Sequence, residues 1–337
     1  MTATFWAPGR VDLIGEHTDY SGGLVLPIAI HLGIELTARP AERISLVSAG
    51  EAVELAPDGS GAPAGWGRYV AGVAQELAAL GRLAVGLEGV VEADLPRGAG
   101  LGSSGALEVV VALALCAFAD FELEPLELAQ ACQRAEQRAV AVPSGILDQA
   151  ASLLGRDGQA LLLDCGTFER RWVELPRQLA ILVVDSGERH SHEGSSYAQR
   201  RAELEAGEPR RVRHVVGENE RVRNLVDALE RGDLNAVGAI LLASHASLRD
   251  DYEVSTGQLD AVVKAALDAG AIGARMSGGG FGGSVVAVAE RNQADAVLEG
   301  TLARAGAQGW IVEASAGART EPSTRRRKDS PPDPASP

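Results

Sequence analysis

Short runs of hydrophobic residues, separated by turn residues, characterise the first ninety positions of the chain. Three such runs, at residues 24–30, 33–38 and 44–48, have the length and composition of β-strands. Residues 66–80 differ, because their apolar side chains recur at helical spacing, and a further strand is predicted at 87–91. These patterns predict a mixed sheet accompanied by a helix.

Helical patterns dominate the remainder of the chain. An almost wholly apolar segment at 106–118 predicts a buried helix, and a second helix is predicted at 125–140. Because helices and strands then segregate instead of alternating regularly, we expect α+β lobes at residues 1–185 and 186–315. The tail at 316–337 is rich in Pro, Ser, Arg and Asp and is predicted to be disordered. The other predicted elements are helices at 197–205, 218–231, 233–248, 255–269 and 292–305 and strands at 158–163, 179–184, 284–289 and 310–314.

Length and composition indicate the number of lobes, the kind of core and the charge of the surface. The 337 residues exceed the roughly 250–300 at which a single core stops growing, which favours two lobes with a cleft. Hydrophobic residues make up 46% of the chain and aromatic residues 4%, so the core should be aliphatic. The net charge of −15 argues against nucleic acid or an anionic membrane as partner. The basic run at 325–328 is therefore interpreted as a solvated charge run.

Cysteine usage predicts a protein of the reducing cytoplasm. A monomer is expected, with an oligomer as the alternative. Cys116, Cys132 and Cys165 are odd in number and lack CxxC spacing, so neither a disulfide framework nor a zinc site is expected. No signal-peptide pattern opens the chain. The longest apolar run, at 107–119, contains Glu108 and falls short of the ~18 residues of a membrane span.

The stretch at residues 9–23 is the first candidate for chemistry. Arg10, Asp12, Glu16, His17 and Asp19 crowd into a segment punctuated by glycines. Burying so many ionisable groups is costly unless they bind something polar, and glycine lets a backbone approach a ligand closely. The segment therefore indicates a site for a small polar molecule, with an exposed acidic loop as the structural alternative.

A second candidate is the glycine-rich loop that precedes the apolar helix. Residues 100–105 satisfy the pattern G-x-G-x-x-G, but a second helix stands where a dinucleotide-binding fold needs a strand. A Walker A loop is also excluded, because no lysine follows the glycines. The remaining interpretation is a phosphate site made of backbone N–H groups at a helix N-terminus. Ser103 and Ser104 are alternatively plain helix caps.

Two acids and a third glycine cluster complete the candidates. Asp148 follows a Pro/Gly turn at the start of a predicted helix, and Glu136 lies twelve positions earlier on the preceding helix. Taken alone, each also fits a structural or solvated helical acid. Glycines at 278–283 surround Phe281, unlike a flexible linker. The polar run at 190–193 contains two histidines, but it has the character of a loop, and no metal site is assigned there.

These segments resemble the motifs of the GHMP kinases, and residues 9–20 are similar to the galactokinase signature, with Asp12 where that family usually has Asn. The glycine loop resembles the second GHMP motif, with Gly102 and Gly105 at positions where Ser and Ala are common. Gly-Ile-Leu-Asp-Gln at 145–149 and the cluster at 275–283 match two further motifs. Residues 195–201 and 245–252 resemble galactokinase segments, the second of them with an expected role in lobe packing.

The resemblance implies a two-lobe GHMP kinase fold, with an N-terminal lobe like the second domain of a small-subunit ribosomal protein and a ferredoxin-like C-terminal lobe. It assigns catalysis to Asp148, which would accept or orient the hydroxyl proton, and to Arg10 beside it. Mg²⁺ would be held by Ser104 and Glu136. The implied sugar contacts are Glu16, His17, Thr18, Asp19, Gly145 and Tyr197. The implied ATP contacts are Gly98, Ala99, Gly100, Leu101, Gly102, Ser103, Ser104 and Ser48.

The activity implied by this resemblance is phosphorylation of the anomeric hydroxyl of galactose by Mg-ATP, the first step of galactose metabolism. Two alternatives stay open at this stage. One is the same chemistry on another sugar such as N-acetylgalactosamine, although Thr18 and the tight turn at 20–23 favour the unmodified sugar. The other is a binding protein that holds galactose and ATP without turnover, whose expected sign, a damaged phosphate loop or a missing catalytic acid, is absent from the sequence.

Overall fold

The computed structural model describes residues 1–96, 98–140, 144–188 and 193–321. Its central element is an 18-residue strand, β2 (Leu24–Ala41), which pairs along most of its length with β1 (Ala3–Ile14). The sequence predicted two strands here, interrupted near Gly33. The strand instead runs on, because Gly33 lets the backbone pass closely over the ring of Trp6.

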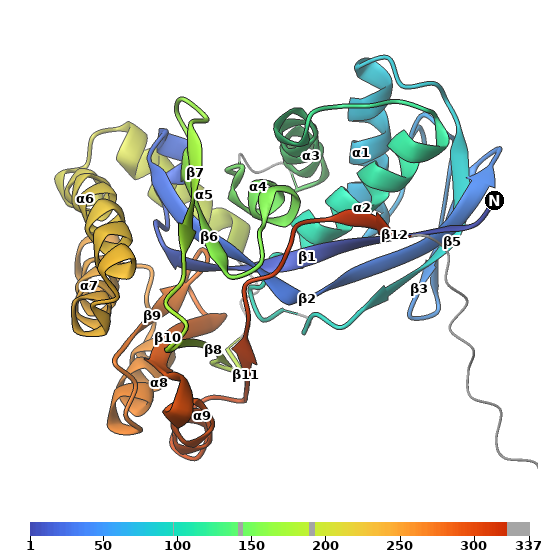
Figure 1. The fold of residues 1–337 in the computed structure, drawn as a ribbon. Helices are drawn as coiled ribbons and strands as arrows, with labels where there is room; N and C mark the ends of the chain where they lie inside the picture. The colour runs from blue at the N-terminus through green and yellow to red at the C-terminus, as the bar shows by residue number, and fades with distance from the viewer. Residues whose placement is uncertain (97, 141–143, 189–192, 322–337) are drawn as a thin grey trace, which may run out of the picture.

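The first lobe is a sheet with helices on one face (Figure 1). Its strands are ordered β12-β1-β2-β5-β3-β4, and β6 and β7 extend from the N-terminal end of β2. All pairs are antiparallel except β3 with β5. The further bounds are β3 (Ile44–Ser48), β4 (Glu51–Leu55), β5 (Gly86–Ala93), β6 (Gln159–Asp164), β7 (Arg170–Glu174), β12 (Arg319–Glu321), α1 (Gly67–Ala79), α2 (Ser103–Phe118), α3 (Pro125–Val140) and α4 (Leu147–Leu154).

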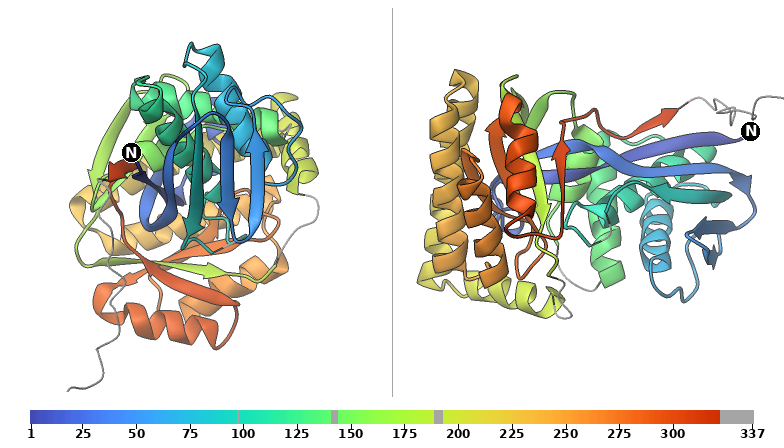
Figure 2. Two further views of the ribbon diagram at one scale, coloured as in Figure 1. Left: turned by 90° about the vertical axis from the view of Figure 1, so that its right-hand side faces the viewer. Right: turned by 90° about the horizontal axis from the view of Figure 1, so that it is seen from below.

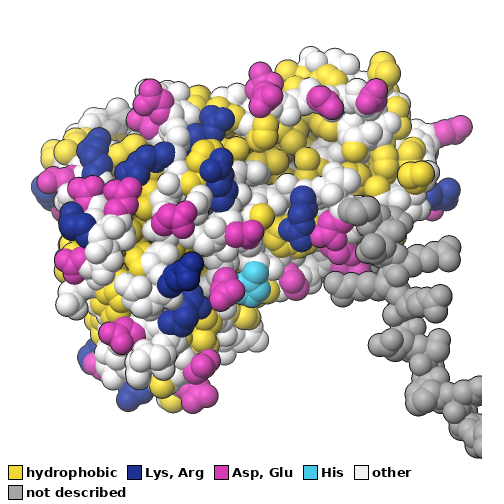
Figure 3. Space-filling model, in the orientation of Figure 1, with side chains coloured by type: hydrophobic (Ala, Val, Ile, Leu, Met, Phe, Trp, Pro, Cys, Tyr) yellow, Lys and Arg dark blue, Asp and Glu magenta, His cyan; other side chains and the backbone are white. Residues whose placement is uncertain are grey.

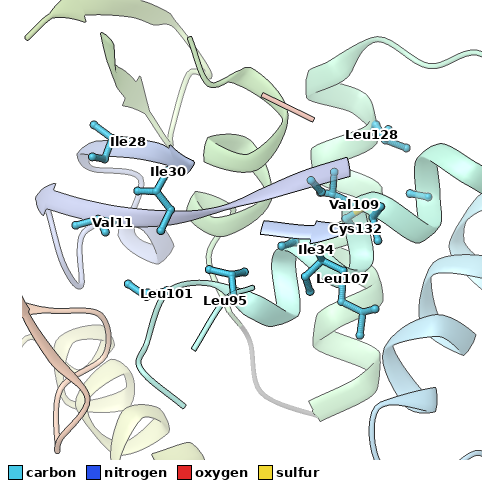
Figure 4. Close-up of a cluster of buried hydrophobic side chains, with 14 of the residues drawn as sticks. Val11, Ile28, Ile30, Ile34, Leu95, Leu101, Leu107, Val109, Leu128 and Cys132 are labelled. Carbon is cyan, nitrogen blue, oxygen red and sulfur yellow. The ribbon is translucent and has the colours of Figure 1, made fainter. Parts of the chain in front are cut away.

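The core of this lobe is aliphatic, as the composition predicts. Helix α2 is apolar around most of its circumference because it is sandwiched between the sheet and the other helices. Figure 4 shows side chains of β1 and β2 facing those of α2 and α3. The residues labelled there are all buried: Val11, Ile28, Ile30, Ile34, Leu95, Leu101, Leu107, Val109, Leu128 and Cys132.

The second lobe contains a four-stranded antiparallel sheet in the order β11-β8-β10-β9. Strand β8 (Leu179–Asp185) is buried on both faces, which explains its uninterrupted apolar sequence. Helices α8 and α9 cover one face of this sheet. The second lobe lies against one end of the first, and β3 and β4 lie at the opposite end of the molecule (Figure 2). The further bounds are β9 (Gly273–Ser277), β10 (Ser284–Glu290), β11 (Gln308–Val312), α5 (Glu193–Glu205), α6 (Pro209–Arg231), α7 (Leu234–Ser247), a π-helix (Leu248–Tyr252), α8 (Gly257–Asp268) and α9 (Ala294–Leu302).

Several boundaries predicted from the sequence are wrong. Strand β8 belongs to the second sheet, so that lobe begins before residue 185, because β8 pairs with β10 and β11. The segment at 316–321 is ordered, since β12 pairs with β1 and the amide of Ala318 bonds to Ser152. Helix α6 begins at Pro209 instead of 218, capped by the side chain of Glu208. Residues 190–192 and 322–337, including the basic run, lie outside the described residues.

Strands β1, β4, β7 and β9 were not predicted. The omission of β1 has a clear cause, because its second half carries the charged groups that had suggested a loop. In the described parts of the chain no helix is both long and apolar enough to cross a bilayer. The three cysteines are free thiols, as expected. Positive and negative side chains intermingle over the face drawn in Figure 3, without a continuous positive surface.

Candidate active site

Strand β1 carries Arg10 and Asp12 to the cleft between the lobes. Register shifts on either side of them, between Pro8 and Arg10 and between Asp12 and Ile14, mark irregularities that re-aim strand side chains. Two positions apart on a strand, the two side chains share a face. Arg10 Nε accordingly lies 3.3 Å from Asp12 Oδ1.

The guanidinium of Arg10 joins three motifs at one point. Its Nε donates to Asp148 Oδ1 at 2.8 Å, and its Nη2 lies 2.7 Å from the same oxygen. Its Nη1 donates to the carbonyl of Gly100 at 2.5 Å. The structure therefore brings together the segment at 9–23, the glycine-rich loop at 100–105 (the candidate phosphate loop) and the candidate catalytic acid. The proximity of Arg10 and Asp148 was predicted from the sequence.

Glycine allows this close packing on the phosphate-loop side. A Cβ atom at Gly105, in the first turn of α2, would lie 2.8 Å from the Cβ of Asp148. A Cβ at Gly102 would lie 3.0 Å from the side chain of Arg10, and Gly102 has a left-handed φ of 70°. The two departures from the family pattern thus stand where Arg10 and Asp148 approach the loop most closely.

Glu136 on α3 and Ser104 on α2 form the second polar contact of the site. The hydroxyl of Ser104 donates to Glu136 Oε1 at 2.9 Å. Glu136 Oε2 accepts from the hydroxyl of Ser144 at 2.9 Å and from Gln149 Nε2 at 3.1 Å. Burial, followed by the charge of Asp148, raises the pKa of Glu136. A cation placed here would relieve that cost.

The glycine cluster at 278–283 packs against the phosphate loop, as expected. The hydroxyl of Ser284 donates to the carbonyl of Ala99 at 2.6 Å. Two cavities open beside these loops. The larger, about 340 Å³, is lined by the glycine loops, Arg10, Glu136, Ser144 and Tyr197. The smaller, about 180 Å³, shares Arg10, Glu136, Ser144, Tyr197, Gly278 and Gly279 with it, so the two adjoin.

The smaller cavity holds the acids of the first motif. Asp12, Glu16, His17, Asp19, Gly145 and Asp148 line it. Gly145 is required by the geometry, because a Cβ there would lie 1.5 Å from Asp19 Oδ2. Burial raises the pKa of Asp12 and of Asp19 to about 7. A cavity lined by buried polar groups of this kind suits a ligand with many hydroxyls.

His17 is held as a neutral imidazole. Its Nε2 donates to the carbonyl of Gly279 at 3.1 Å, since a carbonyl only accepts, and its Nδ1 therefore accepts from the hydroxyl of Tyr20 at 2.9 Å. Burial lowers the pKa of His17 to about 3. The ring of Tyr197 lies 5.4 Å from it, between centroids, at the rim of both cavities.

A buried arginine on β9 ties the site across the lobes. Arg275 forms an ion pair with Glu16 and donates to the carbonyls of Asp12 and Leu13 at 3.3 Å. The amide of Gly278 donates to Glu16 Oε1 at 3.1 Å. Glu16 is thus engaged by the protein itself. Arg275 belongs to the motif at 275–283, and no role was predicted for it.

Not every predicted contact reaches a cavity. Thr18 is fully buried, its hydroxyl bonds to the carbonyls of Gly15 and Leu24, and it lines neither cavity, so its side chain shapes the turn. Ser48 ends β3, paired with Glu51, and is not among the cavity-lining residues. Ala99 and Leu101 are buried, and their carbonyls accept from Ser284 and from the amide of Arg10. Gly98 and Gly100 line the larger cavity.

Sequence reasoning missed Ser144 and Gln149. Gln149 is the last residue of the segment at 145–149 and Ser144 immediately precedes it, and both hydrogen-bond to Glu136. Their positions, eight and thirteen residues after Glu136, gave no signal, because the packing of α3 against α4 creates the contact. The segment at 245–252 packs between the lobes as expected, with Leu248 and Tyr252 fully buried.

Three family models match the chain. They are described as the galactokinase galactose-binding signature, at residues 2–40, the GHMP kinases N terminal domain, at 68–156, and the GHMP kinases C terminal, at 225–305. A galactokinase of Streptomyces coelicolor is 40% identical, covering 93% of this chain and 92% of the relative. A galactokinase of Bos taurus is 41% identical, covering 87% and 85%.

A solved structure shows the same fold. The crystal structure of Lactococcus lactis galactokinase complexed with galactose superposes with a TM-score of 0.88 at 30% sequence identity, covering 94% of this chain and 95% of that one. The two-lobe architecture predicted from the motifs is therefore confirmed.

Proposed function

The chain belongs to the galactokinases of the GHMP kinase family and has galactokinase activity, and we propose that it performs this reaction where Arg10 meets Asp148, at the junction of the two cavities. The products are galactose 1-phosphate and ADP. The observation that carries the proposal is the contact of the Arg10 guanidinium with both the candidate acid and the phosphate loop. No other group in the described residues spans these two motifs in this way.

The larger cavity is the proposed ATP phosphate site. Gly98 and Gly100, in the loop that leads into α2, line this cavity. No side chain caps the N-terminus of α2, so its first amides and its dipole favour an anion. Ser277 and the glycines after it form the opposite wall. Arg10, whose pKa is raised by the charges of Asp12 and Asp148 against the opposing effect of burial, stays charged and stabilises the charge on the transferred phosphoryl group.

The smaller cavity is the proposed galactose site. Asp148 lines this cavity; its Oδ1 is held by Arg10, while its Oδ2 makes no hydrogen bond to the described residues. Oδ2 is the proposed acceptor of the hydroxyl proton. Asp19 and Tyr197 supply further polar contacts, and His17 and Glu16 fix the wall by their bonds to the glycine cluster.

The donor set beside the phosphate site suits Mg²⁺. Glu136 lines the cavity, and the hydroxyl of Ser104 lies behind it as its hydrogen-bond donor. The described residues contain no cluster of three or more His, Cys, Asp or Glu that would form a complete cage. Mg²⁺ typically uses one or two protein oxygens together with substrate phosphates and water. Bound there with ATP, the ion would neutralise phosphate oxygens. The chain's own part is to hold Glu136 ionised and oriented.

We also propose that the protein acts as a monomer in the cytoplasm. The three free thiols fit a reducing compartment.

The test is ADP release with Mg-ATP and, in turn, galactose, N-acetylgalactosamine, glucose and mevalonate. Galactose should give the highest kcat/KM. Asp148→Asn should lower kcat by at least ~100-fold, the usual range for a general base. Asp227→Asn, an exposed acid on α6, is the matched control and should leave kcat unchanged. Turnover by Asp148→Asn equal to that of the control would remove Asp148 from its role, and absence of turnover with galactose would refute the assignment of this cleft.

A further inference from the structure

A buried carboxyl group lies behind the site without a role in the reaction as described. Glu108 is fully buried in α2, surrounded by the otherwise apolar residues of that helix. An ionised carboxylate is rarely buried without a cationic partner or several hydrogen-bond donors. Among the described residues, the side chain of Glu108 has one hydrogen-bond partner, Gln149 of α4, and no ion pair.

Gln149 links this acid to the proposed metal ligand. Its Nε2 donates to Glu108 Oε2 at 2.8 Å and to Glu136 Oε2 at 3.1 Å, so both amide hydrogens are used. The reverse orientation of the amide would place its oxygen against two carboxyl groups. The observed orientation is therefore the one the surroundings favour.

Two buried oxygens remain without a partner in this arrangement. They are Glu108 Oε1 and Gln149 Oε1. Each buried acceptor left unsatisfied costs about 1–3 kcal/mol. A carboxylic acid and a carboxamide are both planar and each carries two polar atoms side by side. A hydrogen bond between one pair of atoms therefore brings the second pair within hydrogen-bonding reach. One proton on Glu108 Oε1, donated to Gln149 Oε1, would satisfy both oxygens at once.

We propose that Glu108 is a protonated acid in the folded protein, that it forms a cyclic hydrogen-bonded pair with Gln149, and that it thereby acts as a positioning residue for Glu136. The second amide hydrogen of Gln149 is then fixed on Glu136. The positioning role rests on the proposed function of Glu136, whereas the protonated pair does not depend on it.

The charges around Glu108 agree with a neutral group. The titratable groups that face it are Glu136 and Cys132 of α3, Asp148 of α4 and Tyr69 of α1, and none of them is a cation. Burial, followed by the charge of Glu136, raises the pKa of Glu108 well above its ordinary value. Ionising Glu108 would place a third negative charge beside Glu136 and Asp148. Keeping it neutral leaves Glu136 as the anion that faces the cavity.

Infrared difference spectroscopy tests the protonated pair directly. The carbonyl stretch of a protonated carboxylic acid is compared between the full-length wild-type protein and Glu108→Gln at about pH 8.5, above the pKa values of about 7 of Asp12 and Asp19. The wild type should show the band, and the variant should lack it. Glu76→Gln is the matched control: Glu76 is a buried acid on α1 that pairs with Arg134 and Arg138, so its replacement should leave the band in place. A wild-type band that is absent, or that survives in Glu108→Gln, overturns the proposal.

Kinetics test the positioning role. Glutamine can form the same cyclic pair with Gln149, so Glu108→Gln should keep kcat within about threefold of wild type, whereas Glu108→Leu should lose at least ~10-fold in kcat and in apparent Mg²⁺ affinity. The KM for galactose should change by less than about twofold in both variants, which a general loss of structure would not allow. Equal losses in the Gln and Leu variants would show that a charged Glu108 is needed and would overturn the proposal.

The two assays also separate this inference from the assignment of the active site. If Glu136→Gln leaves the Mg²⁺ dependence unchanged while the infrared band disappears in Glu108→Gln, the proposed metal site fails and the protonated pair stands. If Glu108→Leu does not fold, the Glu108→Gln variant and the infrared comparison still decide between the two charge states of Glu108.

Discussion

Replacing Asp12 by Asn should stabilise the protein in alkaline solution and change it little in acid. Asp12 is buried on β1 and stands where galactokinases usually have Asn. Its partner Arg10 is shared with Asp148, and its Oδ1 accepts no hydrogen bond from the described residues. Burial, together with the nearby charges of Glu16 and Asp148, therefore outweighs the attraction of Arg10 and raises the pKa of Asp12 to about 7.

The size and sign of the effect follow from proton linkage. A pKa raised from 3.8 to about 7 means that the folded form holds a proton that the unfolded form releases. The free energy of unfolding therefore falls as the pH rises between these values, by up to about 4 kcal/mol at 1.36 kcal/mol per pH unit. Above the folded-state pKa of about 7, this part of the free energy of unfolding is lost completely. Asparagine stays neutral, so Asp12→Asn should escape this loss.

The assay is urea unfolding of wild type and Asp12→Asn at about pH 5 and about pH 8.5, with the free energy of unfolding obtained by linear extrapolation. The variant should gain about 3 kcal/mol over wild type at the higher pH relative to the lower, because about two pH units separate pH 5 from the folded-state pKa of about 7. The raised pKa of Asp19 is common to both proteins and largely cancels. Glu42→Gln, an exposed acid, is the control and should change by less than about 0.5 kcal/mol at either pH.

A stability difference between Asp12→Asn and wild type that does not change with pH would refute this reasoning. It would mean that Arg10 compensates the buried carboxylate fully, so that Asp12 is ionised in the folded protein throughout the range. A difference of opposite sign, with the variant losing stability at high pH, would show that the Arg10–Asp12 ion pair stabilises the native state.

Three further substitutions test other parts of the site. Gly145→Ala should raise the KM for galactose at least ~10-fold and leave that for ATP within about twofold, because the new Cβ displaces Asp19; an unchanged galactose KM in steady-state assays would contradict the assignment of the smaller cavity. Glu136→Gln should raise the Mg²⁺ concentration for half-maximal rate at least ~10-fold, measured by Mg²⁺ titration at saturating ATP, and an unaltered titration would exclude Glu136 as a ligand. Arg275→Met should lower the free energy of unfolding by about 3–5 kcal/mol in urea, because it leaves Glu16 buried without its ion-pair partner, and a loss below about 1 kcal/mol would show that the pair is not needed.

Local sequence was sufficient for the motifs and for most helices. The glycines, the proposed catalytic pair and the acid proposed to bind the metal are carried by short segments whose spacing is set by one turn or one helix, and Arg10, Glu136 and Asp148 lie together as predicted. The apolar segment at 106–118 predicted α2 because a helix buried on all sides needs no polar face. In β1, one of the strands that were not predicted, charged groups in the strand interior hid the periodicity.

The sequence by itself determined which family the chain resembles, which residues carry charge to the cleft and that the core is aliphatic. The tertiary structure decided which lobe β8 joins, since a strand buried on both faces is compatible with either sheet and only pairing with β10 and β11 selects one. It also decided that Thr18 faces the turn, that Arg275 holds Glu16, and that Glu108, Gln149 and Glu136 form one chain of polar contacts. Some of these contacts, such as that of Arg275 with Glu16, join positions more than two hundred residues apart. Their geometry arises from the packing of whole elements, which no local pattern along the chain records.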